Sequence, residues 1–210
     1  MSPRVSEQYK QQKKTDLLKA AKQVFTAKGY HRATMQDLMV AGGVSRGALY
    51  AYFDNIEHVY EELLRLEDEE DALSFQIEDG TQTYWKQLTE WLLTQQKGME
   101  AGEPSLALAN AEYFLSLHYR SDSGNESYMN MRYQRLIEVL TLFFQKGVLQ
   151  GEFNPSVPIA HIARYLISCM DGIVLNTTRL GHEITKVDEQ MEMLVFSLKS
   201  MLFRDGYKGD

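Results

Sequence analysis

A short stretch in the N-terminal part of the chain carries side chains that could contact a nucleic acid. Arg46 offers guanidinium donors that can reach a guanine edge or a phosphate oxygen, and Gly47 would let the backbone approach DNA closely. The hydroxyl groups of Ser45, Tyr50 and Tyr52 could hold phosphate oxygens. No acidic residue lies among them. The pattern predicts a surface that contacts DNA.

Two short helices joined by a glycine turn are predicted to position these side chains. Thr34 can cap the first helix, with Asp37 three residues later to close a capping box. Gly42 and Gly43 mark a sharp turn, because glycine enters left-handed backbone conformations without steric cost. Ser45 then caps the second helix. This arrangement is a helix-turn-helix, whose second helix can enter a DNA major groove.

The second helix is predicted to turn an apolar side inward. Helical spacing places Val44, Ala48, Leu49 and Phe53 on that side and leaves the polar side chains on the open face. The competing interpretation is a small helical hairpin that serves packing alone, with ordinary surface tyrosines. The residue pattern by itself leaves both interpretations open.

Residues 43–53, GVSRGALYAYF, resemble the recognition-helix signature of the TetR/AcrR family of bacterial transcriptional regulators. A long amphipathic helix precedes them and ends near Phe25, Lys28 and Gly29, as in the family. The opening MSPRV and the segment MDGIV near Met170 resemble the YfiR-like branch. The resemblance implies a dimeric, ligand-responsive repressor. It places these residues at the DNA: Thr34, Ser45, Arg46, Gly47, Tyr50 and Tyr52.

One position departs from the family pattern. The family usually carries a lysine that reaches a phosphate at the start of the fourth helix, and this chain has Ile56 there. One phosphate contact is therefore in question. With Arg46 as the single arginine on the reading helix, specific affinity is expected to depend on a dimer.

The composition is that of an ordinary globular protein of 210 residues, with 44% hydrophobic and 24% charged residues. No apolar run approaches the length of about 20 residues needed to span a bilayer, and the N-terminus lacks the apolar core of a secretion signal. The single cysteine, Cys169, excludes an internal disulfide and fits a reducing compartment. These observations predict a cytoplasmic protein that does not engage a membrane.

Charge is distributed unevenly along the chain. The net charge is -7, but residues 1–53 hold nine Lys or Arg against three Asp or Glu, a net of +6. Residues 54–210 hold thirteen against twenty-six, a net of -13. A basic segment attached to an acidic one would orient the encounter with the phosphate backbone.

Helical periodicity continues beyond the helix-turn-helix and predicts an all-α fold of about nine helices. Residues 1–54 would form a helix-turn-helix DNA-binding domain, and 55–210 a helical effector-binding and dimerisation domain. Residues 121–125, SDSGN, are predicted to form a loop. By resemblance, the last two helices, at 159–180 and 187–203, pair with a second copy. Two recognition helices about 34 Å apart would then read a near-palindromic operator.

Aromatic residues that follow the fourth helix could be core or could line an effector pocket. Both tryptophans lie in a helix predicted at 81–97, and a second aromatic group follows Pro104. TetR-type regulators commonly bind effectors in this region. The resemblance therefore supports a pocket lined by Tyr84, Trp85, Leu88, Trp91, Tyr113, Phe114 and Leu117. Its ligand would be an apolar or aromatic small molecule, and a cationic one if Glu112 or Asp171 lines the cavity.

No catalytic constellation is recognisable. The five histidines are dispersed without a carboxylate or cysteine at metal-ligand spacing, and no phosphate-cradling glycine loop or nucleophile elbow occurs. Five successive acidic residues, 67–71, are predicted to be a solvated face, because consecutive helical side chains fan out and cannot converge on one ion. No enzyme activity, cofactor or metal is predicted. The alternative to a repressor is a small-molecule binding or sequestering protein without operator recognition.

Overall fold

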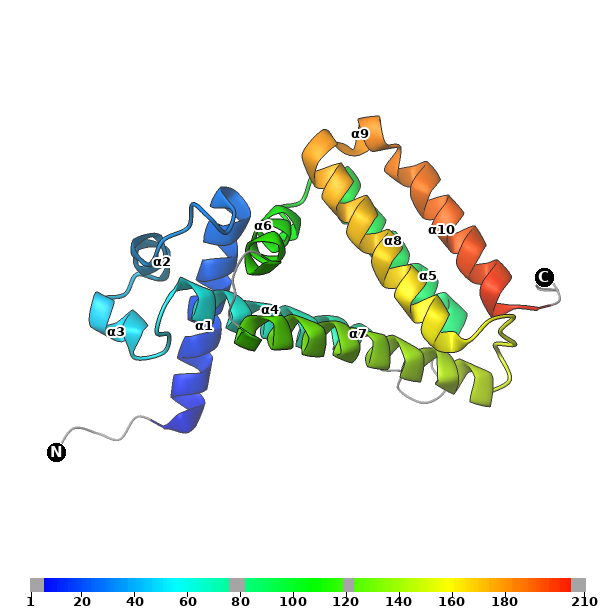
Figure 1. Ribbon diagram of the computed structural model, residues 1–210, viewed down its shortest axis with the longest axis horizontal. Helices are drawn as coiled ribbons and strands as arrows, with labels where there is room; N and C mark the ends of the chain where they lie inside the picture. The colour runs from blue at the N-terminus through cyan, green and yellow to red at the C-terminus, as the bar shows by residue number, and fades with distance from the viewer. Residues whose placement is uncertain (1–5, 76–81, 119–122, 205–210) are drawn as a thin grey trace. The chain divides into compact units, whose positions relative to one another are not determined.

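The computed structural model describes residues 6–75, 82–118 and 123–204, and these residues form an all-α fold (Figure 1). The predicted fold class is therefore confirmed. The described residues contain ten helices, one more than predicted, because the single turn α9 separates the last two long helices. The bounds are α1 Glu7–Lys28, α2 Met35–Gly42, α3 Arg46–Tyr50, α4 Ile56–Ser74, α5 Tyr84–Glu100, α6 Ala107–His118, α7 Ser123–Leu149, α8 Ile159–Leu180, α9 His182–Thr185 and α10 Val187–Leu202.

One predicted loop is wrong in part. Residues 123–125 belong to α7, whereas residues 121 and 122 of the same predicted loop lie outside the described residues. Ser, Gly and Asn are weak helix formers, but intrinsic propensity is a small term that the context of a long helix overrides. None of the described helices is long and apolar enough to cross a membrane.

The chain divides into two compact units. The first unit comprises residues 1–69 and 104–116, and the second comprises residues 70–103 and 117–210. The first unit therefore takes in most of α4 and most of α6 in addition to the predicted DNA-binding domain. The functional division after residue 54 stays a prediction.

Four buried aromatic side chains form the centre of the first unit. Phe25 lies in α1, Tyr30 follows it, Tyr60 lies in α4 and Tyr113 lies in α6. The ring centroids of Phe25 and Tyr60 are 4.6 Å apart, and those of Tyr60 and Tyr113 are 5.0 Å apart, both in edge-to-face geometry. Because Phe25, Tyr60 and Tyr113 come from α1, α4 and α6, the packing of their rings fixes α6 against α1 and α4.

In the second unit, α5, α8 and α10 lie side by side (Figure 1). Their apolar faces form one core that includes Leu88, Leu166 and Leu198. The residues between α7 and α8 close the end of α10: the Asn154 N–H donates to the Leu202 carbonyl, and the Ser156 N–H donates to the Met201 carbonyl, both at 2.9 Å. These bonds satisfy carbonyl groups that a helix end leaves without partners.

Candidate DNA-binding site

The helix-turn-helix forms as the sequence predicts. Thr34 and Asp37 make a reciprocal capping box: Thr34 Oγ1 accepts from the Asp37 N–H at 3.2 Å, and Asp37 Oδ2 accepts from the Thr34 N–H at 3.1 Å. Gly43 ends α2 in the left-handed conformation, with φ 58° and ψ 38°. Ser45 Oγ accepts from the Ala48 N–H at 3.3 Å and caps α3. A Cβ on Gly42 would lie 2.9 Å from Leu17 Cδ2, so glycine allows α2 to pack closely on α1.

The open face of α3 presents one long cationic side chain. Arg46 is exposed, and its guanidinium carbon lies 5.3 Å from the centroid of the Tyr50 ring, within the range of a cation–π contact. Ser45 and Gly47 are also exposed, and a Cβ on Gly47 would meet no atom within 4 Å. Tyr52 is half-buried and offers less of its surface. Five of the six predicted DNA-contacting residues are therefore exposed.

Ala48 does not face inward as predicted. Leu49 and Phe53, four residues apart, are buried and define the inner line of this segment, whereas Val44 is half-buried and Ala48 is exposed. Adjacent positions on a helix diverge by about 100°, so the short Ala48 side chain points away from the line through Leu49. Its methyl group adds a small apolar surface to the open face.

Several lysine residues of α1 form ion pairs within the first unit. Lys14 bonds to Glu62 at 2.6 Å and Lys22 bonds to Glu67 at 2.5 Å, which joins α1 to α4. Lys28 bonds to Asp37 at 2.7 Å, and this hydrogen bond, with those from Thr34, lowers the pKa of the Asp37 carboxyl.

The boundary between the basic and acidic segments of the sequence does not coincide with the boundary between the two units. The first unit holds ten Lys or Arg and eleven Asp or Glu, a net of -1, because acidic residues of α4 lie in the same unit as residues 1–53. The net of +6 over residues 1–53 comes from residues 1–33, because residues 34–53 hold only Arg46 and Asp37 as charged residues.

The acidic run at 67–71 is not the uniformly solvated face that the sequence predicts. The Glu67 carboxylate pairs with Lys22, and the Asp68 side chain is 7% exposed. A helix directs part of any consecutive run toward its neighbours, because each residue turns by about 100°. Among the described residues, no group of three or more His, Cys, Asp or Glu is arranged to hold a metal ion.

Three polar contacts connect α6 to the helices of the first unit. Glu112 Oε2 accepts a hydrogen bond from the His31 N–H at 3.0 Å, and a Cβ on Gly29 would lie 2.7 Å from the same oxygen. Asn110 accepts from the Tyr60 hydroxyl at 2.5 Å, and the Tyr113 hydroxyl donates to Glu61 at 3.0 Å. Glu112 thus holds the connection between α1 and α2, a role that sequence reasoning missed because its partner is 81 residues away.

Tyr113 has the environment of a core residue. Its ring is buried among Tyr30 and Tyr60, and burial, with the neighbouring Glu61 carboxylate, raises the pKa of its hydroxyl strongly. Phe114 lies beside it in the first unit, with the ring centroids 5.8 Å apart. The other predicted pocket residues, Tyr84, Trp85, Leu88, Trp91 and Leu117, belong to the second unit.

The four predicted pocket residues of α5 have different surroundings. Leu88 is fully buried, and Trp85 packs edge-on against Phe203 with the ring centroids 5.5 Å apart. Tyr84 packs against Phe143 at 5.4 Å. Trp91 lies 5.1 Å from the Phe75 ring, and its buried Nε1 donor has no acceptor within the described residues. A buried donor without a partner is unfavourable in an apolar core and is often explained by an absent ligand or water.

The start of α5 is fixed by a carboxylate that the sequence reasoning also missed. Glu152, from the segment between α7 and α8, accepts hydrogen bonds from the Tyr84 and Trp85 N–H groups, both at 2.7 Å. A carboxylate at this place satisfies donors that a helix N-terminus leaves free and interacts favourably with the helix dipole.

Family models match both the N-terminal and the C-terminal part of the chain. Residues 17–63 match the family model "Bacterial regulatory proteins, tetR family", and residues 87–188 match "Tetracyclin repressor-like, C-terminal domain". An "Uncharacterized HTH-type transcriptional regulator YfiR" from Bacillus subtilis (strain 168) is 30% identical over 205 residues, which covers 98% of this chain and 99% of that protein.

A more distant relative is "HTH-type transcriptional regulator QacR" from Staphylococcus aureus (strain Mu50 / ATCC 700699), 25% identical over 86% of this chain and 92% of that protein. Among solved structures, the regulator FadR from Bacillus subtilis in complex with stearoyl-CoA aligns with a TM-score of 0.63. That alignment has 20% sequence identity and covers 86% of this chain and 97% of FadR.

Proposed function

This chain belongs to the TetR family of bacterial regulatory proteins and is a non-enzymatic, DNA-binding transcriptional regulator, and we propose that it represses from a near-palindromic operator as a homodimer. A small-molecule effector releases it from the DNA. The observation that carries the proposal is the open face of α3, where an exposed Arg46 stands among small and hydroxyl-bearing residues with no acidic neighbour in the helix. Its place of action is the cytoplasm, where bacterial operators lie.

Six residues form the DNA contact in this proposal. Arg46 reads a guanine edge, and the exposed backbone at Gly47 approaches the groove wall. Ser45 uses its oxygen atom as the acceptor in the helix cap and retains a hydroxyl proton that can be donated to phosphate. The Thr34 hydroxyl donates to Asp37 Oδ2 at 2.8 Å, so a phosphate contact by Thr34 requires the exchange of that hydrogen bond. The hydroxyl groups of Tyr50 and Tyr52 supply two further phosphate contacts.

The last long helices, α8 and α10, supply the proposed dimer interface. On α10, Met193 and Phe196 are 59% and 63% exposed, although both are apolar. On α8, Ser168 and Gly172 are exposed at positions one helical turn apart, and small residues let a partner helix approach closely. Four such helices in a symmetric bundle would present the two α3 helices to successive major grooves.

The effector site proposed here includes Trp91. Its Nε1 donor is buried without an acceptor beside the Phe75 ring, so an apolar or aromatic effector that carries a hydrogen-bond acceptor would satisfy it. Tyr84, Trp85, Leu88 and Leu117 remain the accompanying candidates. The buried, hydrogen-bonded surroundings of Tyr113 favour a structural role for that residue over direct ligand contact.

The contacts of α6 suggest how effector binding reaches the DNA-binding helices. Glu112, Asn110 and Tyr113 bind α6 to the α1–α2 connection and to α4, so a displacement of α6 would displace the helix-turn-helix with it. An effector shifts the balance between the two conformations only to the extent that it binds them unequally.

The proposal is tested by a mobility shift with the DNA upstream of the protein's own gene. Arg46→Ala should weaken the specific complex by about five- to 150-fold, because a bidentate arginine–guanine contact contributes about 1–3 kcal/mol. Arg135→Ala removes the same charge from the exposed surface of α7 in the second unit and serves as the matched control. Equal binding by both variants would exclude the role of Arg46. No specific complex for the wild type would favour a sequestering protein.

A further inference from the structure

Ala48 places an exposed methyl group on the open face of α3. Each helical residue turns by about 100°, so Ala48 lies on one flank of the buried Leu49. The cation–π pair of Arg46 and Tyr50 lies on the other flank. Between the two flanks Gly47 presents bare backbone, where a Cβ would meet no atom within 4 Å. The open face of α3 therefore has a cationic flank and an apolar flank.

Both flanks of a recognition helix can face base edges. An α-helix with its side chains is about 10–12 Å across and the major groove of B-DNA is about 12 Å wide, so the helix fills the groove from wall to wall. The N-terminal residues of such a helix contact the bases, and Ala48 lies two residues after the first residue of α3. A short side chain touches a base only where the backbone comes close, and the bare backbone at Gly47 permits that approach.

A methyl group distinguishes between base edges by apolar contact. In the major groove, the apolar group of an unmodified base pair is the C5 methyl group of thymine, and alanine is among the side chains that contact it. The other edge positions are hydrogen-bond donors and acceptors, which a methyl group would leave without partners. We propose that Ala48 reads the C5 methyl group of a thymine in each half-site, in addition to the guanine read by Arg46. This inference rests on the proposed operator binding and adds Ala48 to the proposed base contacts.

A purely structural role for Ala48 makes a different prediction. Alanine is the best helix former, and a helix as short as α3 benefits from it whatever the side chain touches. In that case Ala48→Gly weakens the complexes with all DNAs by the same factor. A methyl contact instead changes the ratio of affinities for two DNAs that differ by one methyl group. A general loss of helix stability cancels in that ratio.

The test uses the full chain and the DNA upstream of its own gene, with binding followed by fluorescence anisotropy. Each thymine of the bound site is replaced in turn by deoxyuridine, symmetrically in the two half-sites. Deoxyuridine keeps every hydrogen-bonding group of thymine and lacks only the C5 methyl group. At one thymine position, the replacement should weaken wild-type binding about fourfold for each half-site, as expected for one buried methyl group. In Ala48→Gly the same replacement should change binding less than about twofold.

Two further variants make the comparison specific to Ala48. Ala51→Gly is the matched control, because it removes an exposed methyl group from the same flank beyond the end of α3. It should keep the roughly fourfold effect of deoxyuridine. Ala48→Ser keeps the Cβ and brings a hydroxyl group toward the thymine methyl group, so it should also reduce the effect below about twofold. This variant provides the measurement if the glycine variant does not bind DNA.

Three results would overturn the inference: no thymine whose methyl group affects wild-type binding, an undiminished deoxyuridine effect in the Ala48 variants, or an effect that is lost in Ala51→Gly and kept in Ala48→Gly. A wild type that binds no DNA specifically would remove the proposed function together with this inference. Specific binding that is insensitive to every thymine methyl group would remove this inference alone.

Discussion

Arg46 and Tyr50 act as a pair on the open face of α3. The guanidinium group lies over the Tyr50 ring, and the neighbouring Gly47 and Ala48 are too small to support it. A long, flexible side chain held in this way loses less conformational freedom on binding a base. Tyr50 therefore has two separable contributions: a hydroxyl for phosphate and a ring that orients Arg46.

Replacement of Tyr50 separates these contributions. Tyr50→Phe keeps the ring and should weaken binding to all DNA sequences alike, whereas Tyr50→Leu removes the ring and should also reduce discrimination. An exposed cation–π contact contributes about 0.5–1 kcal/mol. The preference for the operator over the same DNA with the contacted guanine replaced should therefore be about two- to fivefold smaller in Tyr50→Leu than in Tyr50→Phe. Competition binding with the two DNAs measures this ratio. The same ratio in both variants would show that the ring does not orient Arg46.

At the scale of elements, α5 depends on a residue remote in sequence for its N-terminal cap. Thr83 caps the helix locally by accepting from the Lys86 N–H at 3.1 Å. Glu152 satisfies two further N–H groups from the segment before α8 and so joins that segment to the start of α5. The position of α5 in the second unit is thus determined by both local and tertiary contacts.

Glu152→Gln should lower the free energy of unfolding by about 1–3 kcal/mol, because one oxygen and the negative charge are lost while two helix donors remain. For a chain of this size, that corresponds to a fall in Tm of roughly 2–4 °C per kcal/mol. Thermal unfolding followed by circular dichroism measures it. Glu138→Gln, at an exposed site on α7, should leave Tm within a degree or so. Similar changes in both variants would argue against a capping role for Glu152.

At the scale of the whole molecule, the proposed function requires two copies at a fixed separation. One α3 helix carries a single arginine, and the cations Lys14 and Lys22 are engaged by α4. One copy therefore has few contacts available for specific binding. The proposed interface on α8 and α10 would supply the remaining affinity by joining two such half-site contacts.

Phe196→Glu tests that interface. The side chain is 63% exposed in the protomer, so the change should preserve helicity while it buries a charge between copies and produces monomers. Sedimentation analysis should show the loss of dimer, and operator affinity should fall to that of a half-site. Leu149→Glu, at a position 84% exposed on α7, should remain dimeric. A dimeric Phe196→Glu variant would place the interface elsewhere.

The sequence by itself determined the helix-turn-helix and most helix bounds. The Thr34–Asp37 capping box, the left-handed Gly43 and the Ser45 cap depend on contacts within four residues, so residue types at short spacing are sufficient to predict them. The family signature then indicated the function. These features did not predict the full extent of the first unit, the exposure of Ala48 or the surroundings of the aromatic residues in α5 and α6.

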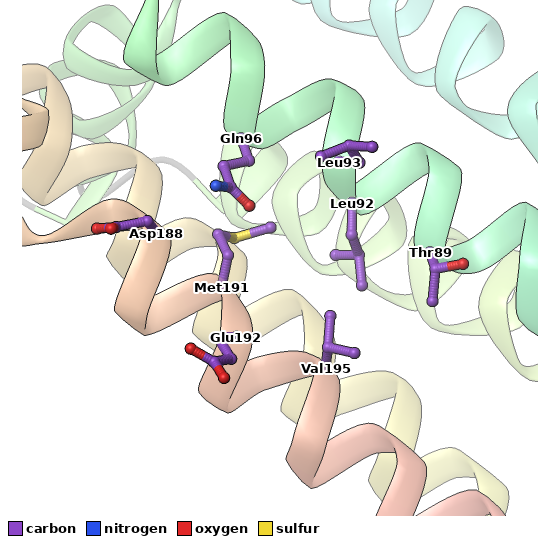
Figure 2. A pocket seen from close by; sticks show the side chains of 8 residues that line it. All are labelled: Thr89, Leu92, Leu93, Gln96, Asp188, Met191, Glu192 and Val195. Atoms are coloured by element: carbon purple, nitrogen blue, oxygen red, sulfur yellow. The ribbon is translucent and has the colours of Figure 1, made fainter.

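Tertiary structure alone decided the contacts between distant residues. Lys14 meets Glu62 across 48 positions, Glu152 reaches Tyr84 across 68, and Glu112 reaches His31 across 81. A groove of about 440 Å³ between α5 and α10 likewise exists only because residues 89–96 and 188–195 pack side by side (Figure 2). Such contacts depend on how apolar faces pack against one another, and that packing is a property of the folded chain rather than of any short segment.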